Sequence, residues 1–319
     1  MIDLLTVGEP LVVFAALENN KSLADASRFQ KHLAGAELNV AIGLARLGFK
    51  TEYLSTVGQD PFGDYIKKRL QAENVGHSYL TETTAAWNGF ELKQRVTHGD
   101  PQTFYFRKNS AVSHIDPTVV SQIDFTQVRF LHLSGIYAAT SPHAIELVNA
   151  LITSARKAHT TIIFDPNLRA ALWQTPQEMI TACNQIATQA DFVIPGKTEG
   201  QLLTGFSDPR EIANFYLAQG CRAVIIKTGP QGAFFKTTNT EHFVPGFKLE
   251  QIVDTVGAGD GFVAGLISGL LDKVALTQAV LRGNAIGALA TQTAGDSDNY
   301  PTKSVLQTFI KTTPRQNFS

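Results

Sequence analysis

Residues 161–194 read TIIFDPNLRAALWQTPQEMITACNQIATQADFVI, and this stretch decides the fold class. The apolar run Thr161–Phe164 has the length of a buried strand, and Gln177–Gln189 has helical spacing. A second apolar run, Phe192–Ile194, follows the helical segment. Strands that alternate with helices in this way are typical of a parallel sheet covered on both faces.

The same alternation extends through most of the chain. Apolar runs predict further strands at Leu4–Val7, Thr51–Val57, Phe130–Leu133 and Ala223–Ile226. Helical spacing predicts further helices at Asn39–Leu47, Phe62–Glu73, Pro142–Ala158 and Pro209–Gln219. Because such sheets bind ligands beyond the carboxyl ends of their strands, we expect a functional site in the loops that follow them.

Two stretches interrupt this rhythm, at about residues 10–35 and 87–110. Neither has a crossover helix, and Phe90–Val96 alternates apolar and polar residues before the aromatic run Phe104–Phe106. We predict that the two stretches form one small antiparallel element that stands off the main sheet as a lid. No linker or repeat divides the chain, so residues 1–319 are predicted to be a single domain.

Composition excludes several classes of protein. With 44 % apolar residues among 319, the chain can bury a sizeable core. Lysine and arginine number 27 against 28 acids, and a nucleic-acid-binding protein is usually more basic. The apolar segment Phe262–Leu271 is shorter than the roughly 20 residues that cross a bilayer. Two cysteines and an acidic N-terminus without a signal pattern complete the prediction of a cytoplasmic protein with no nucleic-acid or membrane partner.

The segment Asp254–Phe262, DTVGAGDGF, carries the strongest functional signal. A glycine-rich turn that enters a helix exposes backbone N–H groups at the positive end of the helix dipole, which suits a phosphate. Asp260 has two interpretations here. It is either a helix cap or a base that accepts a hydroxyl proton beside the amides. A cap explains neither Asp254 nor the two glycines, Gly257 and Gly259, that weaken the start of the helix.

Other known motifs are excluded by single residues. Gly196-Lys197-Thr198 resembles the end of a Walker A loop, but Asp191 stands where its first glycine is needed. Phe262 stands where a dinucleotide fingerprint needs its third glycine. The eight histidines lack zinc-site spacing, and His132 lies in an apolar strand, where we predict a core histidine with satisfied hydrogen bonds rather than a ligand.

DTVGAGDGF resembles the C-terminal signature of the ribokinase-like (phosphofructokinase-B type) sugar kinases. Residues 34–41, AGAELNVA, are similar to the N-terminal signature of the same family. The resemblance covers nearly the whole chain. It implies an α/β, ribokinase-like three-layer sandwich with a mostly parallel central sheet and a small β lid. It also implies an ATP-dependent carbohydrate kinase that uses Mg²⁺.

The resemblance also implies roles for individual residues. Asp260 corresponds to the catalytic base, and Gly257, Ala258 and Gly259 correspond to the anion hole around the transferred phosphoryl group. The implied nucleotide-binding residues are Asn167, Lys227, Thr228, Gly229, Gly232, Gly257 and Gly259. The implied sugar-binding residues are Gly35, Asn39, Tyr105, Arg107, Arg169, Asp260 and Asp296. Glu199 is expected to act on Mg²⁺ through water, and a K⁺ ion near Asp254 is left open.

Within the family the chain is most similar to kinases of the acidic sugar 2-dehydro-3-deoxygluconate (KDG), through residues 164–169, 195–200 and 295–296. An arginine fork can bind a carboxylate through two parallel hydrogen bonds, and Arg107 and Arg169 are at the expected positions. The alternatives are a solvated charge for Arg107 and an ion pair with Asp165 for Arg169.

The implied reaction is ATP-dependent phosphorylation of 2-dehydro-3-deoxy-D-gluconate at its 6-hydroxyl. Two alternatives stay open: a kinase of a neutral ketose such as fructose, and a non-catalytic relative that binds sugar or nucleotide. The galactonate epimer of KDG is not distinguished. Because lid edges in this family are often covered by a second subunit, a homo-oligomer, dimer or higher, is expected.

The chain departs from the family at two places. Gly196 stands where many members have the asparagine of an N-x-x-E motif, although Glu199 is retained. Phe90-Glu91 stands where some KDG kinases place a tyrosine against the substrate. An acid at position 91 would repel a carboxylate if it pointed inward, and strand alternation leaves it equally able to face water.

Overall fold

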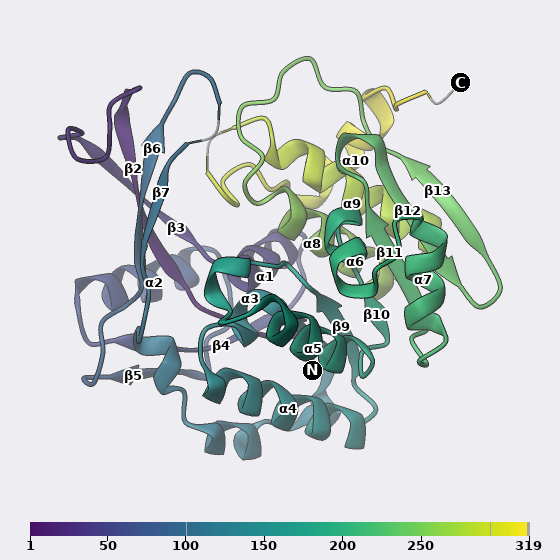
Figure 1. Cartoon of the computed structure of the whole chain (residues 1–319), viewed down its shortest axis with the longest axis horizontal. Coiled ribbons are helices and arrows are strands. Elements are labelled where there is room, and N and C mark those ends of the chain that lie inside the picture. The colour runs from purple at the N-terminus through teal and green to yellow at the C-terminus, as the bar shows by residue number, and fades with distance from the viewer. Residues whose placement is uncertain (100, 294, 318–319) are drawn as a thin grey trace.

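Two β-sheets of unequal size organise the fold of the computed structural model, which describes residues 1–99, 101–293 and 295–317 (Figure 1). The strands of the larger sheet are β1 (Ile2–Val7), β4 (Thr51–Gly58), β5 (Leu80–Thr83), β8 (Val128–Ser134), β9 (Thr161–Asp165), β10 (Phe192–Val193), β11 (Ala223–Lys227), β12 (Gly232–Thr237) and β13 (Glu241–Pro245). They lie in the order β13-β12-β11-β10-β9-β8-β1-β4-β5. Only the β11–β12 and β12–β13 pairings of this described sheet are antiparallel, so the predicted mostly parallel sheet is confirmed.

The apolar sequence of the central strands follows from burial on both faces. In β9, Ile162 and Phe164 belong to one hydrophobic core, and Ile163 belongs to the core on the opposite face. All three side chains are fully buried. Complete burial of such a side chain stabilises the fold by roughly 1.5–3 kcal/mol. Successive residues of a strand point to opposite faces, so a strand between two cores is apolar at most of its positions.

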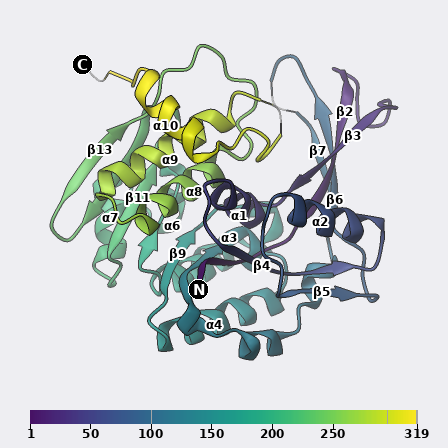
Figure 2. The ribbon, with the colours of Figure 1, turned by 180° about the vertical axis from the view of Figure 1, so that it is seen from behind.

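Helices cover both faces of this sheet. They are α1 (Ala36–Arg46), α2 (Pro61–Ala72), α3 (Gly135–Ala138), α4 (Pro142–Lys157), α5 (Pro176–Ala187), α6 (Lys197–Thr204), α7 (Pro209–Leu217), α8 (Ala258–Leu271), α9 (Leu276–Ala290) and α10 (Lys303–Thr312). Residues of α3 to α7 pack into one core, and residues of α1, α8, α9 and α10 pack into the other. This arrangement is the predicted three-layer α/β sandwich (Figures 1 and 2).

The starts of several helices differ in how their backbone N–H groups are capped. The helices α2, α4, α5 and α7 each begin with proline after a residue whose side chain accepts a backbone N–H, and those capping residues are Asp60, Ser141, Thr175 and Asp208. By contrast, α1 follows Gly35 and α8 follows Gly257, with no side-chain cap at either place. The N-termini of α1 and α8 therefore keep backbone groups available for other partners.

The smaller sheet consists of β2 (Leu11–Asn19), β3 (Phe29–Ala34), β6 (Phe90–Arg95) and β7 (Thr103–Phe106), in the order β3-β2-β6-β7. It stands to one side of the larger sheet (Figure 2). The pairs β2–β3 and β6–β7 are antiparallel, but β2 and β6 are parallel. The prediction of an antiparallel element was therefore wrong at this pairing. A short connection forces antiparallel pairing within each hairpin, and it places no such constraint between two hairpins.

His132 lies inside strand β8. His132 is 1 % exposed, and its Nδ1 lies 2.9 Å from Thr6 Oγ1, so its predicted place in the core is confirmed, but among the described residues its Nε2 has no hydrogen-bond partner. Burial lowers the pKa of His132 to about 3, which keeps the ring neutral.

Among the described residues, no helix combines the length and the apolar character needed to cross a bilayer.

Candidate active site

Two cavities lie beyond the carboxyl ends of β9 and β11. The first has a volume of about 290 Å³ and is lined mostly by the segments that follow β11, together with α8 and α9. The second has a volume of about 420 Å³ and is lined by residues of both sheets. Lys227, Thr255 and Gly259 line both cavities, so the two spaces meet at the N-terminus of α8.

The turn before α8 requires glycine at its centre. Gly257 has a φ of 76°, and a Cβ there would lie 2.0 Å from the carbonyl oxygen of Asp296. In the described part of the chain, the N–H groups of Gly259 and Asp260 have no acceptor, whereas that of Ala258 donates to Thr255 O at 3.3 Å. Unpaired N–H groups at the start of a 14-residue helix form an anion-binding site.

Asp260 lies in the first turn of α8 and is 8 % exposed. Its Oδ2 accepts a hydrogen bond from Asn39 Nδ2 at 2.8 Å, and its Oδ1 accepts one from Asn167 Nδ2 at 3.2 Å. Among the described residues it accepts no backbone N–H, and Gly257 is the N-cap, so the alternative that Asp260 is a helix cap was wrong.

The charge state of Asp260 is set by its surroundings. Burial raises the pKa of Asp260 to about 8. The hydrogen bond from Asn39 opposes this rise, and the nearby acids Asp165 and Asp296 add to it. A carboxylate with a pKa this close to neutrality can take a proton from a hydroxyl group more readily than an ordinary aspartate can.

Lys227 brings a positive charge to the point where the cavities meet. Its Nζ donates to both carboxylate oxygens of Asp165 at 2.8 Å and lies 3.8 Å from the position that a Cβ would take at Gly259. Burial lowers the pKa of Lys227, but the attraction of Asp165 and Glu199 outweighs burial and holds that pKa above its ordinary value. The ammonium group is therefore charged beside the unpaired amides of α8.

The second cavity is polar and contains most of the residues predicted to bind sugar. Gly35, Tyr105, Arg169, Asp260 and Asp296 all line it. Asn39 supports two of them, because its Nδ2 donates to Asp296 Oδ2 at 3.3 Å as well as to Asp260. Asn167, which was predicted to bind nucleotide, also lines this cavity.

Only one of the two predicted carboxylate-binding arginines lines this cavity. Arg169 lines it, and its Nη1 donates to Leu168 O at 2.9 Å. The alternative of an ion pair between Arg169 and Asp165 was wrong, since both oxygens of Asp165 are bound to Lys227.

Arg107 has a different partner. It follows β7, its Nε donates to Glu9 Oε2 at 2.8 Å, and both side chains are less than 10 % exposed. The alternative of a solvated charge was therefore wrong. Arg107 lines a separate surface hollow with Trp87 and Phe106 and is absent from the lining of the polar cavity.

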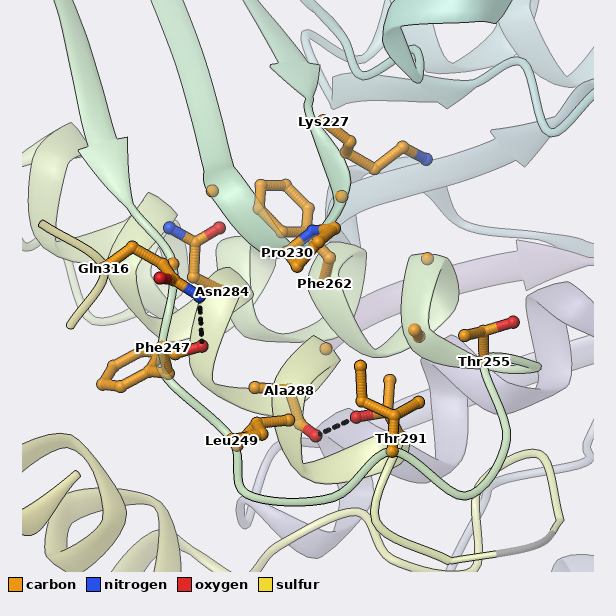
Figure 3. A pocket seen from close by; sticks show the side chains of 17 residues that line it. Lys227, Pro230, Phe247, Leu249, Thr255, Phe262, Asn284, Ala288, Thr291 and Gln316 are labelled. Carbon is orange, nitrogen blue, oxygen red and sulfur yellow. Dashed lines mark hydrogen bonds between the residues drawn. The ribbon is translucent and has the colours of Figure 1, made fainter. Parts of the chain in front are cut away.

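The first cavity is mainly apolar, and Figure 3 shows its lining from close by. Of the residues predicted to bind nucleotide, Lys227, Gly229, Gly232 and Gly259 line it. Thr228 does not, since its hydroxyl donates to Gly232 O at 2.8 Å and closes the turn after β11. Among the lining residues that the sequence did not indicate are Phe247, Leu249, Ile252, Asn284, Ala288, Thr291 and Gln316. No local pattern marks them, because they come from a loop, a helix and the C-terminal segment.

Two charged residues of the polar cavity were not assigned to it from the sequence: Lys93 was missed, and the direction of Glu91 was left open. Glu91 and Lys93 lie two residues apart on β6 and both face the cavity, as do Thr103 and Tyr105 on the paired strand β7. The period-two alternation of β6 was the signal that could have placed Lys93 beside Glu91. Lys93 Nζ also donates to Asp254 Oδ2 at 2.7 Å, which links the smaller sheet to the glycine-rich turn.

The site suits a metal ion that arrives with a nucleotide. No group of three or more histidine, cysteine, aspartate or glutamate side chains in the described ranges could enclose a metal. Glu199 lines the polar cavity, and its Oε1 and Oε2 accept backbone N–H groups of Leu168 at 2.7 Å and Gly196 at 2.6 Å. A carboxylate oxygen keeps a second lone pair, so Glu199 can still accept a hydrogen bond from metal-bound water. Mg²⁺ commonly binds in this way, with phosphates and several retained waters.

Known proteins similar to this chain match it over nearly its whole length. The model of the pfkB family carbohydrate kinase matches residues 1–303. The 2-dehydro-3-deoxygluconokinase of Bacillus subtilis (strain 168) is 43 % identical over 310 residues, which cover 97 % of this chain and 95 % of that protein.

Solved structures extend the similarity to three dimensions. A PfkB protein from Polaromonas sp. JS666 has 39 % identity and a TM-score of 0.87, with 96 % of this chain and 99 % of that chain covered. A putative Ribokinase II from E. coli, solved in complex with ATP and Mg²⁺, has 26 % identity and a TM-score of 0.88, with 98 % and 99 % covered.

Proposed function

The chain belongs to the pfkB family of carbohydrate kinases, and from this premise we propose that it phosphorylates 2-dehydro-3-deoxy-D-gluconate at the 6-hydroxyl with ATP. One observation carries the proposal. The apolar cavity and the polar cavity meet at Lys227, Thr255 and Gly259, with the Asp260 carboxyl group on the polar side. A nucleotide in the first cavity and a sugar in the second would bring their reacting groups together there.

The chemistry follows from the groups at this junction. Asp260 accepts the proton of the sugar hydroxyl as that oxygen attacks the terminal phosphorus in line with the leaving group. The amides of Gly257 and Gly259 and the ammonium group of Lys227 would stabilise the negative charge on the transferred phosphoryl group, and the amide of Ala258 would join them only by releasing Thr255 O. Mg²⁺ bound with the nucleotide phosphates would be held by Glu199 through water and would supply further neutralisation of phosphate charge.

Arg169 supports an acidic sugar as substrate. It lines the polar cavity, and no carboxylate in the described part of the chain forms an ion pair with it. A guanidinium group in this position suits the carboxylate of KDG, whereas a neutral ketose offers it no charged partner. The B. subtilis relative, with 43 % identity, is a 2-dehydro-3-deoxygluconokinase. Asp296 lines the polar cavity and would hydrogen-bond a sugar hydroxyl group, with Asn39 holding the Asp296 and Asp260 carboxylates from behind.

Within a single domain of residues 1–319, the segments 10–35 and 87–110 would act as a lid. The smaller sheet that they form contributes Leu11, Glu91, Lys93, Thr103 and Tyr105 to the wall of the polar cavity. A lid excludes water, which would otherwise hydrolyse ATP at the activated site.

The outer side of the smaller sheet supports a homo-oligomer, dimer or higher. Trp87 is 81 % exposed, Phe104 54 % and Phe106 45 %. A cluster of large exposed aromatic side chains on a sheet with open edges is typical of an interaction surface. A second copy of the chain would cover it, and light scattering of the wild type and of a Phe104→Ser, Phe106→Ser variant tests this: the wild type should be oligomeric and the variant smaller.

The proposed reaction is tested by a direct comparison of KDG and fructose with ATP and Mg²⁺. We expect a much higher kcat/KM for KDG, with the product phosphorylated at the 6-position by NMR. A preference for fructose would favour the neutral-ketose alternative. An absence of turnover across a panel of sugars would favour a non-catalytic relative.

A further inference from the structure

Glu91 is a carboxyl group in the polar cavity that the reaction, as described so far, does not use. It lies on β6, is half-buried, and lines the same cavity as Arg169, Asp260 and Asp296. Its strand partner on β7 is Tyr105, which lines the cavity beside it. The sequence alone left Glu91 free to face water, and the structure turns it towards the polar cavity.

The Glu91 carboxyl group has no protein partner within the described residues, which form no hydrogen bond or ion pair with it. The nearby cations are differently engaged. Lys93 is bound to Asp254, and Arg107 is bound to Glu9. Arg169 is the remaining cation, and it has no acidic partner among the residues described. Glu91 and Arg169 are thus an acid and a base that face one cavity and are both available to a ligand.

We propose that Glu91 is a specificity-determining residue that binds the acid sugar in its protonated form and donates its O–H to an oxygen atom of that sugar. The proposal rests on the proposed function, because it takes the substrate to be an acidic sugar. The geometry supports it, since an ionised Glu91 in the same cavity would repel the carboxylate that Arg169 attracts. A neutral carboxylic acid removes that repulsion and adds an O–H donor to the cavity wall beside Tyr105.

The charges around Glu91 favour the protonated form. Burial raises the pKa of Glu91 to about 7, and the negative charge of Asp296, from the segment after α9, adds to this rise. Lys93, Arg107 and Arg169 oppose it from β6, from the end of β7 and from the loop after β9. The Tyr105 hydroxyl on β7 also faces Glu91, and burial keeps it neutral by raising its pKa.

Binding of an acid sugar shifts this balance further. A substrate carboxylate that neutralises Arg169 removes one of the three cations that stabilise ionised Glu91. The proton of Glu91 is then held more tightly, and any fraction that was ionised takes up a proton from solvent on binding. A neutral sugar leaves the positive charge of Arg169 uncompensated, so Glu91 keeps all three stabilising cations. The affinity for the acid sugar should therefore depend on pH much more strongly than the affinity for a neutral sugar.

The test measures KM for KDG at pH 6.5 and pH 8.5 in the wild type and in two variants. We expect the wild-type KM to rise about tenfold at the higher pH, because free Glu91 ionises above its pKa. Glu91→Gln keeps an N–H donor and should show a low KM at both pH values. Glu91→Ala should show a KM raised about tenfold at pH 6.5, with little further change at pH 8.5.

A matched control removes an acid from the same sheet. Glu18 lies on β2, where its carboxylate accepts hydrogen bonds from Ser27 and Arg28 outside the cavity. Glu18→Gln should reproduce the wild-type KM and its pH dependence. Calorimetry of KDG binding at pH 7.5 in two buffers of different ionisation enthalpy gives a readout independent of turnover. The wild type should take up more protons than Glu91→Gln.

The outcomes separate this inference from the proposed function. A wild-type enzyme that phosphorylates KDG with the same KM as Glu91→Ala at pH 6.5 would overturn the inference alone. The same holds if Glu91→Gln keeps the wild-type pH dependence of KM. A wild type that neither binds nor phosphorylates KDG would overturn both.

Discussion

The apolar and polar cavities meet at Gly259 but are built in different ways. The apolar cavity takes its whole lining from residues 227–316, within the C-terminal third of the chain. The polar cavity takes its lining from residues as distant as Leu11 and Asp296, and from both sheets. Lys227 is the only ionisable side chain among the described residues that line the apolar cavity, whereas several acids and bases line the polar one.

This difference indicates where each kind of recognition resides. A nucleotide base is a large flat group, and an apolar space lined by backbone turns suits it. A small sugar exposes little apolar surface, so it has to be distinguished by hydrogen bonds and charges. The smaller sheet supplies many of those groups, and the residues at the junction serve both ligands. Variants in the two cavities should therefore affect different kinetic constants.

The largest effect is expected at the junction. Asp260→Asn should lower kcat by about 10²-fold or more, because the amide cannot accept the hydroxyl proton. Neither KM should change by more than a few-fold. Steady-state kinetics with both substrates measures this. Asp272→Asn, at the opposite end of α8, is the matched control and should keep wild-type turnover. Near-normal turnover in Asp260→Asn would remove Asp260 from the mechanism.

A change confined to the polar cavity should affect only the sugar. Arg169→Ala should raise KM for KDG by about 10- to 100-fold, the usual cost of a lost charge-assisted hydrogen-bond pair. KM for ATP should stay unchanged. Arg169→Lys should give an intermediate KM, since it keeps the charge and loses the fork. Equal losses for KDG and for a neutral sugar would contradict recognition of the carboxylate by Arg169.

A substitution in the apolar cavity should affect only the nucleotide. Ala288 is partly exposed on α9 and faces the space in Figure 3. Ala288→Leu should raise KM for ATP about tenfold, because the larger side chain occupies part of the base-binding space. KM for KDG serves as the internal control and should not move. A variant that raised KM for the sugar instead would break the assignment of the two cavities.

The smallest effect is a pH dependence at the junction. Asp260 has a pKa raised to about 8, so it is mostly protonated at pH 7.5 and mostly ionised at pH 8.5. Only the ionised form can accept a proton, so kcat at saturating sugar should rise about threefold over this interval. Asp260→Asn should lose the rise. A flat wild-type profile would show that proton transfer to Asp260 does not limit turnover.

Local patterns in the sequence determined the scaffold and the centre of the site. The apolar runs and the helical spacing predicted the main sheet and several of its helices, because these signals depend on neighbours within a few residues. DTVGAGDGF predicted the turn before α8, since only glycine can adopt the backbone of Gly257 against Asp296. His132 was also placed correctly from a local pattern, because a single polar residue within an apolar strand is buried with the strand.

Tertiary structure alone decided which charges meet. The sequence could not show that Arg107 is bound to Glu9, that Asp165 is bound to Lys227, or that Glu91 faces the sugar cavity. It also could not show that β2 and β6 pair in parallel. These arrangements join residues far apart in the chain, and a charge carries no local sign of its partner. Helix and strand periodicity act over a few residues, whereas the chemistry of a cavity depends on how distant segments pack.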